Sequence, residues 1–234
     1  MGIGQVNLTL YRAAIFDLDG TLIDGVDDLL FAMNETLAAH DLTPLARPEL
    51  EAMLGEGTKM LTKRAFDARG VTIDGQQLDD CEGYFTTRYI DTDYAHTRLF
   101  ENVEAVLRQL KSDGWTIALA SNKPEAPCKE ILTKLGIADL FTVIAGGNSF
   151  EVKKPDGRFL EFVLGQLGFD SATDTAIMVG DHANDVNAAR AAKIHAIAVA
   201  MEVDSTRANS LGADAVVTRY GDLYGAVMGI TAAR

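Results

Sequence analysis

The sequence predicts an α/β fold in which an open parallel sheet carries an inserted block of helices. Short apolar or β-branched runs alternate with amphipathic helical patterns along most of the 234 residues, and this alternation is typical of a parallel sheet covered on both faces. The alternation breaks between the first and second runs, where residues 24–98 contain helical patterns and no convincing strand. With 47% hydrophobic residues, the chain can bury the sizeable core that such a fold needs.

Six short runs are expected to form the strands of the sheet. Each is rich in alanine, valine, isoleucine or threonine, and most are followed by polar residues. In chain order they are residues 13–16, 116–120, 142–145, 175–179, 196–200 and 215–217.

Apolar residues recur at helical spacing between the later runs. Ile131, Leu132 and Leu135 share one helical face, and Gly136 follows them as a helix stop. An earlier segment has the full i, i+3, i+4, i+7 pattern at Val103, Val106, Leu107 and Leu110. These helices are expected to cover the sheet.

The break in the alternation is expected to be a helical subdomain. Its first helix carries apolar residues in one register, at Val26, Leu29, Leu30, Met33 and Leu37. Further helical patterns cover residues 48–54, 58–69 and 76–94, with glycines between them. The sequence thus predicts two units, a sheet domain of residues 1–23 plus 99–234 and a helical subdomain of residues 24–98.

Charge and composition argue against several classes of function. A formal charge of −13 disfavours non-specific binding to nucleic acid or to anionic membrane, because both are polyanions. No apolar run approaches ~18 residues, so no membrane-spanning helix is expected. Cys81 and Cys128 lack metal-ligand spacing and fit a reducing compartment, and the first residues show no signal-peptide pattern. We expect a cytoplasmic protein.

Unusual polar residues follow four of the expected strands. The first strand runs into DLDGT (17–21), the second into SNK (121–123) and the fourth into GDHAND (180–185), while KKP (153–155) follows a glycine-rich turn after the third. Ligands of open parallel sheets bind beyond the carboxyl ends of the strands. If these strands are neighbours, their polar residues converge on one site.

The acidic residues at these strand ends require a cation or a captured proton. Two carboxylates ~4 Å apart repel by ~4 kcal/mol at an effective dielectric of ~20, and four would meet here: Asp17, Asp19, Asp181 and Asp185. Carboxylates without a histidine or cysteine cluster favour a hard ion, and Mg²⁺ is the expected cofactor. Together with Lys154 and the hydroxyl of Ser121, such an ion suits a phosphoryl group.

The spacing of Asp17 and Asp19 suits two different roles. In extended backbone the two side chains point to the same side, ~7 Å apart, and Gly20 permits a turn that brings them closer. One carboxylate can attack phosphorus while the other protonates the departing oxygen and then activates water.

These motifs resemble those of a known family. DLDGTL, SN, KKP and GDHAND match, in order, the four motifs of the haloacid dehalogenase-like (HAD) phosphatases, and residues 24–98 lie where that superfamily inserts a helical cap. The match covers nearly the whole chain. The resemblance implies a Rossmann-like parallel sheet core with an all-α cap, and a Mg²⁺-dependent phosphoric monoester hydrolase.

The resemblance also implies a role for each motif residue. Asp17 would be the nucleophile that forms an aspartyl-phosphate, and Asp19 the general acid and base. The metal would be held by Asp17, by the backbone carbonyl of Asp19 and by Asp181. The remaining residues would bind the phosphoryl oxygens (Ser121, Asn122 and Lys154) or orient these groups (Thr21 and Asp185). For Asn122 a purely structural role is the alternative.

Within the superfamily, residues 53–66, 121–127 and 145–157 resemble the phosphoglycolate phosphatase group. This resemblance implies a small phosphorylated metabolite as substrate, with 2-phosphoglycolate as the first choice. Gly25 and Val26 depart from that group's usual Ser and Ala, and Lys193 departs from its usual Gly. A sugar-phosphate or nucleotide phosphatase, a phosphosugar mutase and a non-catalytic protein that binds a phosphate ligand are the alternatives. A monomer or a homodimer is expected.

Several other polar residues have a simple structural explanation. Asp24 directly precedes a helical pattern and is expected to be a helix N-cap or a hinge residue. His182 is expected to fill a loop, because Mg²⁺ seldom takes imidazole, and Lys153 is expected to have no role. The segment 55–57 forms either a loop over the substrate or a plain connection. A solvated helix face is expected to carry four basic residues, Lys59, Lys63, Arg64 and Arg69. One of them could instead bind a substrate carboxylate.

Overall fold

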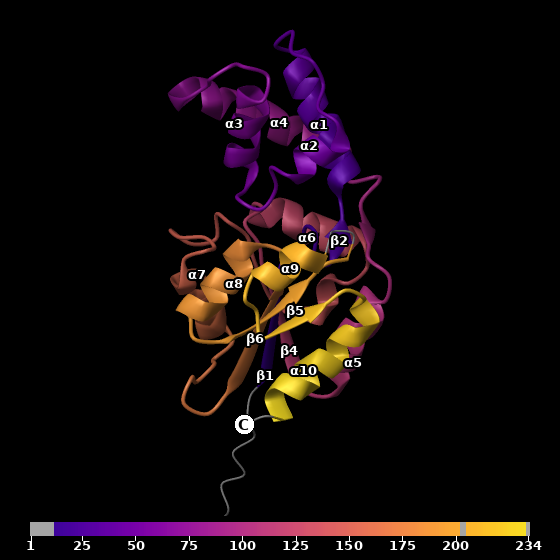
Figure 1. The fold of residues 1–234 in the computed structure, drawn as a ribbon, viewed down its shortest axis with the longest axis vertical. Coiled ribbons are helices and arrows are strands. Elements are labelled where there is room, and N and C mark those ends of the chain that lie inside the picture. Colours follow the sequence, from indigo (N-terminus) through magenta and orange to yellow (C-terminus); the bar gives the residue numbers. More distant parts are fainter. Residues whose placement is uncertain (1–11, 202–204, 233–234) are drawn as a thin grey trace, which may run out of the picture.

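A six-stranded parallel sheet forms the centre of the molecule in the computed structural model, which describes residues 12–201 and 205–232 (Figure 1). The strand order is β5-β4-β1-β6-β7-β8. The strands are β1 (Arg12–Phe16), β4 (Trp115–Ala120), β5 (Phe141–Ala145), β6 (Thr175–Gly180), β7 (His195–Val199) and β8 (Ala215–Val217). All five pairings are parallel, as the sequence predicts.

The register of the three central strands brings their carboxyl ends to one level. Phe16 at the end of β1 lies beside Leu119 of β4 on one side and beside Val179 of β6 on the other. The residues that follow these three strands therefore emerge side by side at one edge of the sheet. This edge is where the sequence places its polar motifs.

Alternating residues of β1 enter two separate cores, because successive side chains of a strand point to opposite faces. Ala14 and Phe16 pack with apolar residues of α5 (Val103–Ser112), α6 (Glu125–Lys134) and α10 (Leu223–Ala232). Ala13 and Ile15 pack with residues of α7 (Gly157–Gln166) and α8 (Ala183–Ala191). Helices thus cover both faces of the sheet (Figure 1). Three short helices complete this part of the chain, η1 (Ala138–Leu140), α9 (Ser205–Ser210) and η2 (Tyr220–Asp222).

The four helices within residues 24–98 form the helical insert, which lies above the carboxyl edge of the sheet in Figure 1. They are α1 (Val26–Ala38), α2 (Arg47–Glu51), α3 (Thr58–Asp67) and α4 (Gly75–Asp91). Helix α4 packs against both α1 and α3, and its buried residues include Cys81 and Phe85. An α/β fold with a helical insert is therefore confirmed.

Two very short strands join the helical insert to the rest of the chain. Strand β2 (Ile23–Asp24) pairs antiparallel with β3 (Arg98–Leu99). The expectation that residues 24–98 hold no strand is wrong at these two ends. Strands of two residues are too short to show a period of two, so the sequence pattern does not reveal them.

The described helices are all too short or too polar to cross a bilayer. This agrees with the absence of any long apolar run from the sequence.

Candidate active site

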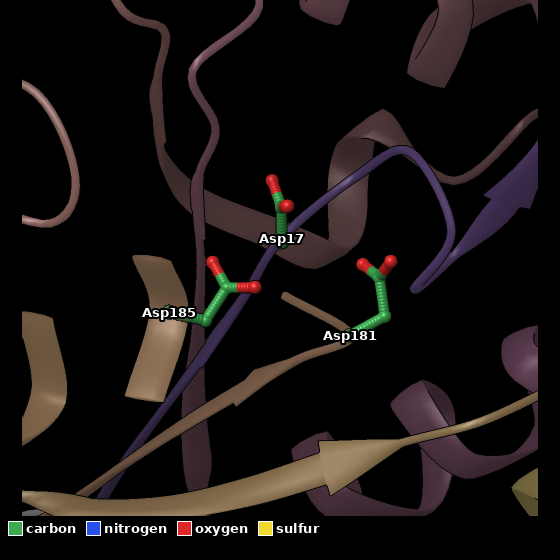
Figure 2. Close-up of side chains that lie close together, drawn as sticks. All are labelled: Asp17, Asp181 and Asp185. Carbon is green, nitrogen blue, oxygen red and sulfur yellow. The ribbon is translucent and has the colours of Figure 1, made fainter. Parts of the chain in front are cut away.

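Carboxylates from neighbouring segments meet at the carboxyl edge of the sheet (Figure 2). Asp17 directly follows β1, Asp181 directly follows β6, and Asp185 lies in the first turn of α8. Each of the three offers a carboxylate oxygen, and these oxygens lie within 4.8 Å of one another. The structure therefore brings together three of the four aspartates that the sequence predicts to cluster.

Glycine at two positions is what allows the carboxylates to approach so closely. Gly20 has φ +77°, and a Cβ there would stand 2.5 Å from Asp181 Oδ2. A Cβ on Gly180 would stand 2.2 Å from the carboxylate carbon of Asp185. Next to Gly20, the hydroxyl of Thr21 donates a hydrogen bond to Asp181 Oδ1 at 2.9 Å. The turn after β1 thus both makes room for Asp181 and orients it.

Lys154 supplies a buried positive charge to this cluster. Its Nζ lies 2.6 Å from Asp185 Oδ1 and 3.0 Å from Asp17 Oδ1, and its side chain is 1% exposed. Burial opposes the charge of the ammonium, but the two carboxylates outweigh it and raise the pKa of Lys154. The second oxygen of Asp185 accepts a hydrogen bond from the backbone N–H of His182 at 3.0 Å.

One lysine does not satisfy the negative charge of the cluster. Burial, followed by repulsion from Asp185 and Asp17, raises the pKa of Asp181. Burial also raises the pKa of Asp185, although Lys154 opposes this shift. Among the described residues, the buried Asp19 Oδ1 has no hydrogen-bond partner, and the buried Asp17 Oδ1 has only its ion pair with Lys154. Oxygen ligands at this density and charge fit a hard divalent ion, so the cluster can hold a metal ion.

Asp19 points toward a second buried lysine, Lys123, which the sequence analysis does not assign. The Nζ of Lys123 lies 3.0 Å from Asp19 Oδ2 and donates a hydrogen bond to the hydroxyl of Tyr89 at 3.2 Å. The same ammonium lies 4.5 Å from the centroid of the Tyr89 ring. Burial again opposes the charge, and Asp19 outweighs it to raise the pKa of Lys123. The position of Lys123 two residues after Ser121, at a strand end, is the sequence signal that could have identified it.

Ser121 and Asn122 lie beside the carboxylates at the end of β4. The buried Ser121 Oγ accepts a hydrogen bond from the backbone N–H of Lys123 at 3.3 Å, which leaves its own proton for another acceptor. Asn122 Nδ2 donates to the carbonyls of Gly55 at 2.9 Å and Lys154 at 3.0 Å. Within the described residues, the backbone N–H of Asn122 has no hydrogen-bond acceptor. The Nδ2 of Asn122 therefore holds two carbonyls in place, and its backbone N–H is left to bind an anion.

The segment 55–57 of the helical insert docks onto these residues. The carbonyl of Gly55 accepts a second hydrogen bond from Asn184 Nδ2 at 3.0 Å, and that of Glu56 accepts one from Lys153 Nζ at 2.8 Å. Lys153, for which no role is expected from the sequence, therefore reaches the insert. Because three donors meet two adjacent carbonyls, this segment is more than a plain connection between helices.

Asp24 is not the helix N-cap that its position in the sequence suggests. The N-cap of α1 is Gly25, and Asp24 lies in β2 with its side chain 3% exposed. Its carboxylate pairs with Arg47 Nη2 at 3.0 Å and with Arg98, and accepts a hydrogen bond from the backbone N–H of Val26 at 3.2 Å. Asp24 thus links both connections between the insert and the sheet.

A cavity of about 350 Å³ lies between the carboxyl edge of the sheet and the helical insert. Polar residues at its base include Asp17, Asp19, Ser121, Lys123 and Asp181. The insert contributes apolar side chains, Val26, Leu29, Leu54 and Leu61, together with Arg47. A small molecule with one polar end fits such a lining.

Other residues singled out in the sequence lie away from the cavity lining or have structural partners. Lys59, Lys63, Arg64 and Arg69 pair with Asp79, Asp67, Glu56 and Glu49, and none of the four lines the cavity. His182 lines the cavity and is the N-cap of α8, accepting a hydrogen bond from the backbone N–H of Asn184 at 3.2 Å. Cys81 and Cys128 are buried and unbridged.

Comparisons with known proteins agree with this geometry. Residues 14–199 match the family model described as haloacid dehalogenase-like hydrolase. The chain is 37% identical over 178 residues to a phosphoglycolate phosphatase of Cereibacter sphaeroides. The alignment covers 76% of this chain and 80% of that protein. It is also 34% identical over 220 residues to a phosphoglycolate phosphatase of Rhodospirillum rubrum. That alignment covers 91% of this chain and 89% of that protein.

A solved structure with the same fold comes from Haemophilus somnus and is described as a predicted phosphoglycolate phosphatase. It superimposes with a TM-score of 0.84 at 26% identity and covers 96% of this chain and 99% of that chain. The similarity therefore extends over the sheet and the helical insert together.

Proposed function

The chain belongs to the haloacid dehalogenase-like hydrolases, and on that premise we propose that it is a Mg²⁺-dependent phosphatase that cleaves a small phosphate monoester, with 2-phosphoglycolate as the best candidate. The observation that carries this proposal is the cluster at the carboxyl edge. Asp17, Asp181 and Asp185 lie together, Lys154 pairs with Asp17 and Asp185, and Asp17 and Asp181 line a cavity of about 350 Å³.

In the first step, a carboxylate oxygen of Asp17 attacks the phosphorus atom and the bond from phosphorus to the ester oxygen breaks. Asp19 gives its proton to that departing oxygen. In the second step, Asp19 takes a proton from a water molecule that attacks the aspartyl-phosphate on Asp17. The bond between phosphorus and the Asp17 oxygen breaks, and inorganic phosphate leaves.

Three groups hold the transferring phosphoryl oxygens during both steps. Lys154 places its ammonium beside Asp17, and Ser121 keeps its hydroxyl proton for an acceptor in the cavity. The third donor is the backbone N–H of Asn122 rather than its amide, which already serves two carbonyls. Donors fixed in advance stabilise the charge that develops in the transition state.

Mg²⁺ would be held by the carboxylates of Asp17 and Asp181 and by the backbone carbonyl of Asp19, and would neutralise charge on the phosphoryl oxygens. Thr21 orients Asp181 through its hydrogen bond. Asp185 is proposed to orient Lys154, because its two oxygens bind Lys154 and the backbone N–H of His182. Such supporting bonds fix the position of ligand groups.

The choice of 2-phosphoglycolate is supported by the relatives that carry the name phosphoglycolate phosphatase and by the small cavity. Residues 24–98 are proposed to act as a cap whose boundaries with the core fall in the β2–β3 pair, at 23/24 and 98/99. A reducing cytoplasmic location is also proposed, in keeping with two buried unbridged cysteines.

The proposal is tested by phosphate release from a panel of esters with Mg²⁺: 2-phosphoglycolate, hexose phosphates, nucleotides and an aryl phosphate. We expect 2-phosphoglycolate to be turned over best, and Asp17→Asn or a chelator to reduce turnover of every ester by at least about a thousandfold. Asp67→Asn, an exposed aspartate of α3, is the control and should keep full activity. Turnover that survives Asp17→Asn or the chelator would contradict the mechanism. Conversion of a hexose phosphate to its isomer would instead identify a mutase.

A further inference from the structure

Lys123 is a buried cation that the proposed mechanism leaves without a task. Its side chain is 4% exposed and lies at the carboxyl end of β4, where it lines the cavity. Taking an ammonium out of water costs several kcal/mol before its partners compensate. A structural role alone would be met at lower cost by an apolar side chain, so the charge calls for a specific use.

The hydrogen-bonding capacity of this ammonium is not exhausted. Lys123 carries three N–H donors. Two are directed to Asp19 Oδ2 at 3.0 Å and to the Tyr89 hydroxyl at 3.2 Å. No further acceptor of Lys123 Nζ is present among residues 12–201 and 205–232. One donor therefore remains for a group that enters the cavity.

The position of Lys123 coincides with the place where the leaving group must lie. Asp19 is proposed to protonate the departing ester oxygen, so whatever that oxygen carries lies next to Asp19 and thus next to Lys123. In 2-phosphoglycolate, one methylene carbon separates the ester oxygen from the carboxylate. A donor beside Asp19 is therefore within reach of that carboxylate.

Lys154 and Arg47, the other cations of the site, are committed elsewhere. Lys154 is bound between Asp17 and Asp185 at the phosphoryl end. Arg47 lines the cavity but is held by three carboxylates, Asp24 at 3.0 Å, Asp27 at 2.7 Å and Glu51 at 2.8 Å. A substrate anion at Arg47 would meet those three negative charges, whereas at Lys123 it meets one.

Tyr89 connects this site to the helical insert. The tyrosine comes from α4, and its ring and hydroxyl both contact Lys123. Its own ring packs edge-on against Tyr94 at 5.2 Å between centroids. The lysine is thus enclosed only when α4 is docked, which excludes water from the contact and strengthens it.

We propose that Lys123 binds the carboxylate of the leaving group and so selects phosphate esters of 2-hydroxy acids over neutral esters of the same size. The inference rests on the proposed phosphatase function and names the residue that sets its substrate class. In this assignment Asp19 acts on the ester oxygen, Lys123 binds the carboxylate, and Tyr89 holds the lysine in place.

The test compares kcat/KM for 2-phosphoglycolate with kcat/KM for its neutral amide, 2-phosphoglycolamide, in Mg²⁺. The wild-type protein is expected to prefer the acid by ~10- to 100-fold, the range of a hydrogen bond to a charged group. In Lys123→Met this preference should fall to about threefold or less, because the hydrogen bond from the ammonium to the substrate carboxylate is lost. Lys123→Arg should keep most of it, and Tyr89→Phe, which preserves the ring, should reduce it by ~2- to 5-fold.

Each outcome separates this inference from the proposed function. If the wild-type protein prefers the acid and Lys123→Met keeps that preference while both rates fall together, Lys123 only positions Asp19 and the inference is overturned. If the wild-type protein hydrolyses neither ester with Mg²⁺, the phosphatase proposal itself fails. If Lys123→Met does not fold, Tyr89→Phe still decides, since an unchanged ratio in that variant overturns the inference.

Discussion

The carboxyl edge of the sheet and the helical insert contribute to the same cavity in different ways. The sheet supplies charged side chains that contact each other directly while buried, as Lys154 does with Asp17 and Asp185. The insert contributes mainly apolar side chains and two backbone carbonyls, at Gly55 and Glu56, that accept hydrogen bonds from the sheet side. The chemistry is thus built into the sheet, while the insert closes the cavity mainly through apolar side chains and backbone carbonyls, with one exposed ion pair between its Asp93 and Lys134 of α6.

The energies of the two kinds of contact differ accordingly. Removing one partner of a buried ion pair costs ~3–5 kcal/mol, because the other charge stays buried without compensation. A single neutral hydrogen bond contributes only ~0.5–1.5 kcal/mol. In the described residues no ion pair joins the insert to Asp17, Asp181 or Asp185, so opening of the insert would leave the carboxylate cluster intact, as a part that admits substrate and releases product requires.

The largest effect is expected for Lys154→Met, which removes the charge between Asp17 and Asp185. The free energy of unfolding should fall by ~3–5 kcal/mol in metal-free buffer, and kcat/KM should fall by at least ~1000-fold, as expected when a phosphoryl-binding charge is lost. Chemical denaturation and phosphate release measure the two effects. Lys153→Met, the same change at the next residue, is the matched control, because Lys153 is exposed. Equal effects of both substitutions would mean that the buried charge of Lys154 contributes no more to stability and activity than the exposed charge of Lys153.

An intermediate effect is expected for Gly55→Ala, which tests whether the docking of segment 55–57 matters for substrate. Gly55 has φ +104°, and a Cβ there would stand 2.7 Å from the ring of His182. Gly70→Ala is the matched control, since Gly70 has φ +75° with nothing within 4 Å of its Cβ. Both should lose ~1–2 kcal/mol of stability from backbone strain.

Only Gly55→Ala should raise KM. The expected rise is ~10-fold, which corresponds to a loss of about 1.4 kcal/mol in the docking of segment 55–57. Steady-state kinetics and thermal unfolding of the two variants separate strain from docking. If Gly70→Ala raises KM as much as Gly55→Ala does, general destabilisation explains both.

The difference between the carboxyl edge of the sheet and the helical insert also explains which features the sequence could predict. Asp17 and Asp181 are recognisable because each interrupts an apolar strand at its end, and the level register of parallel neighbours then brings them together. The pairing of Lys123 with Tyr89 joins residues 34 positions apart in different parts of the fold. No local pattern encodes it, because it depends on how α4 docks.

At Asp24 the local sequence pattern predicts a role that long-range contacts replace. Its local sequence resembles a helix N-cap, and an aspartate before an apolar periodic run usually is one. In the structure Arg47 and Arg98 bind it, 23 and 74 residues away. Long-range charge pairs override the local preference, and the sequence shows only that preference.

The smallest effect is expected for Lys153→Met, which removes one exposed hydrogen bond between the sheet side and the insert, that to the carbonyl of Glu56 at 2.8 Å. The carbonyl of Gly55 keeps both of its donors, Asn122 and Asn184, so the segment remains docked. We expect KM to rise by ~2- to 5-fold with little change in kcat, because the bond contributes ~0.5–1 kcal/mol to the closed arrangement. Lys59→Met on α3, where the lysine pairs with Asp79 away from the cavity lining, is the control and should leave KM unchanged. A rise in KM of ~100-fold for Lys153→Met would mean that this one exposed hydrogen bond, and not the buried contacts of Gly55, holds the insert against the sheet.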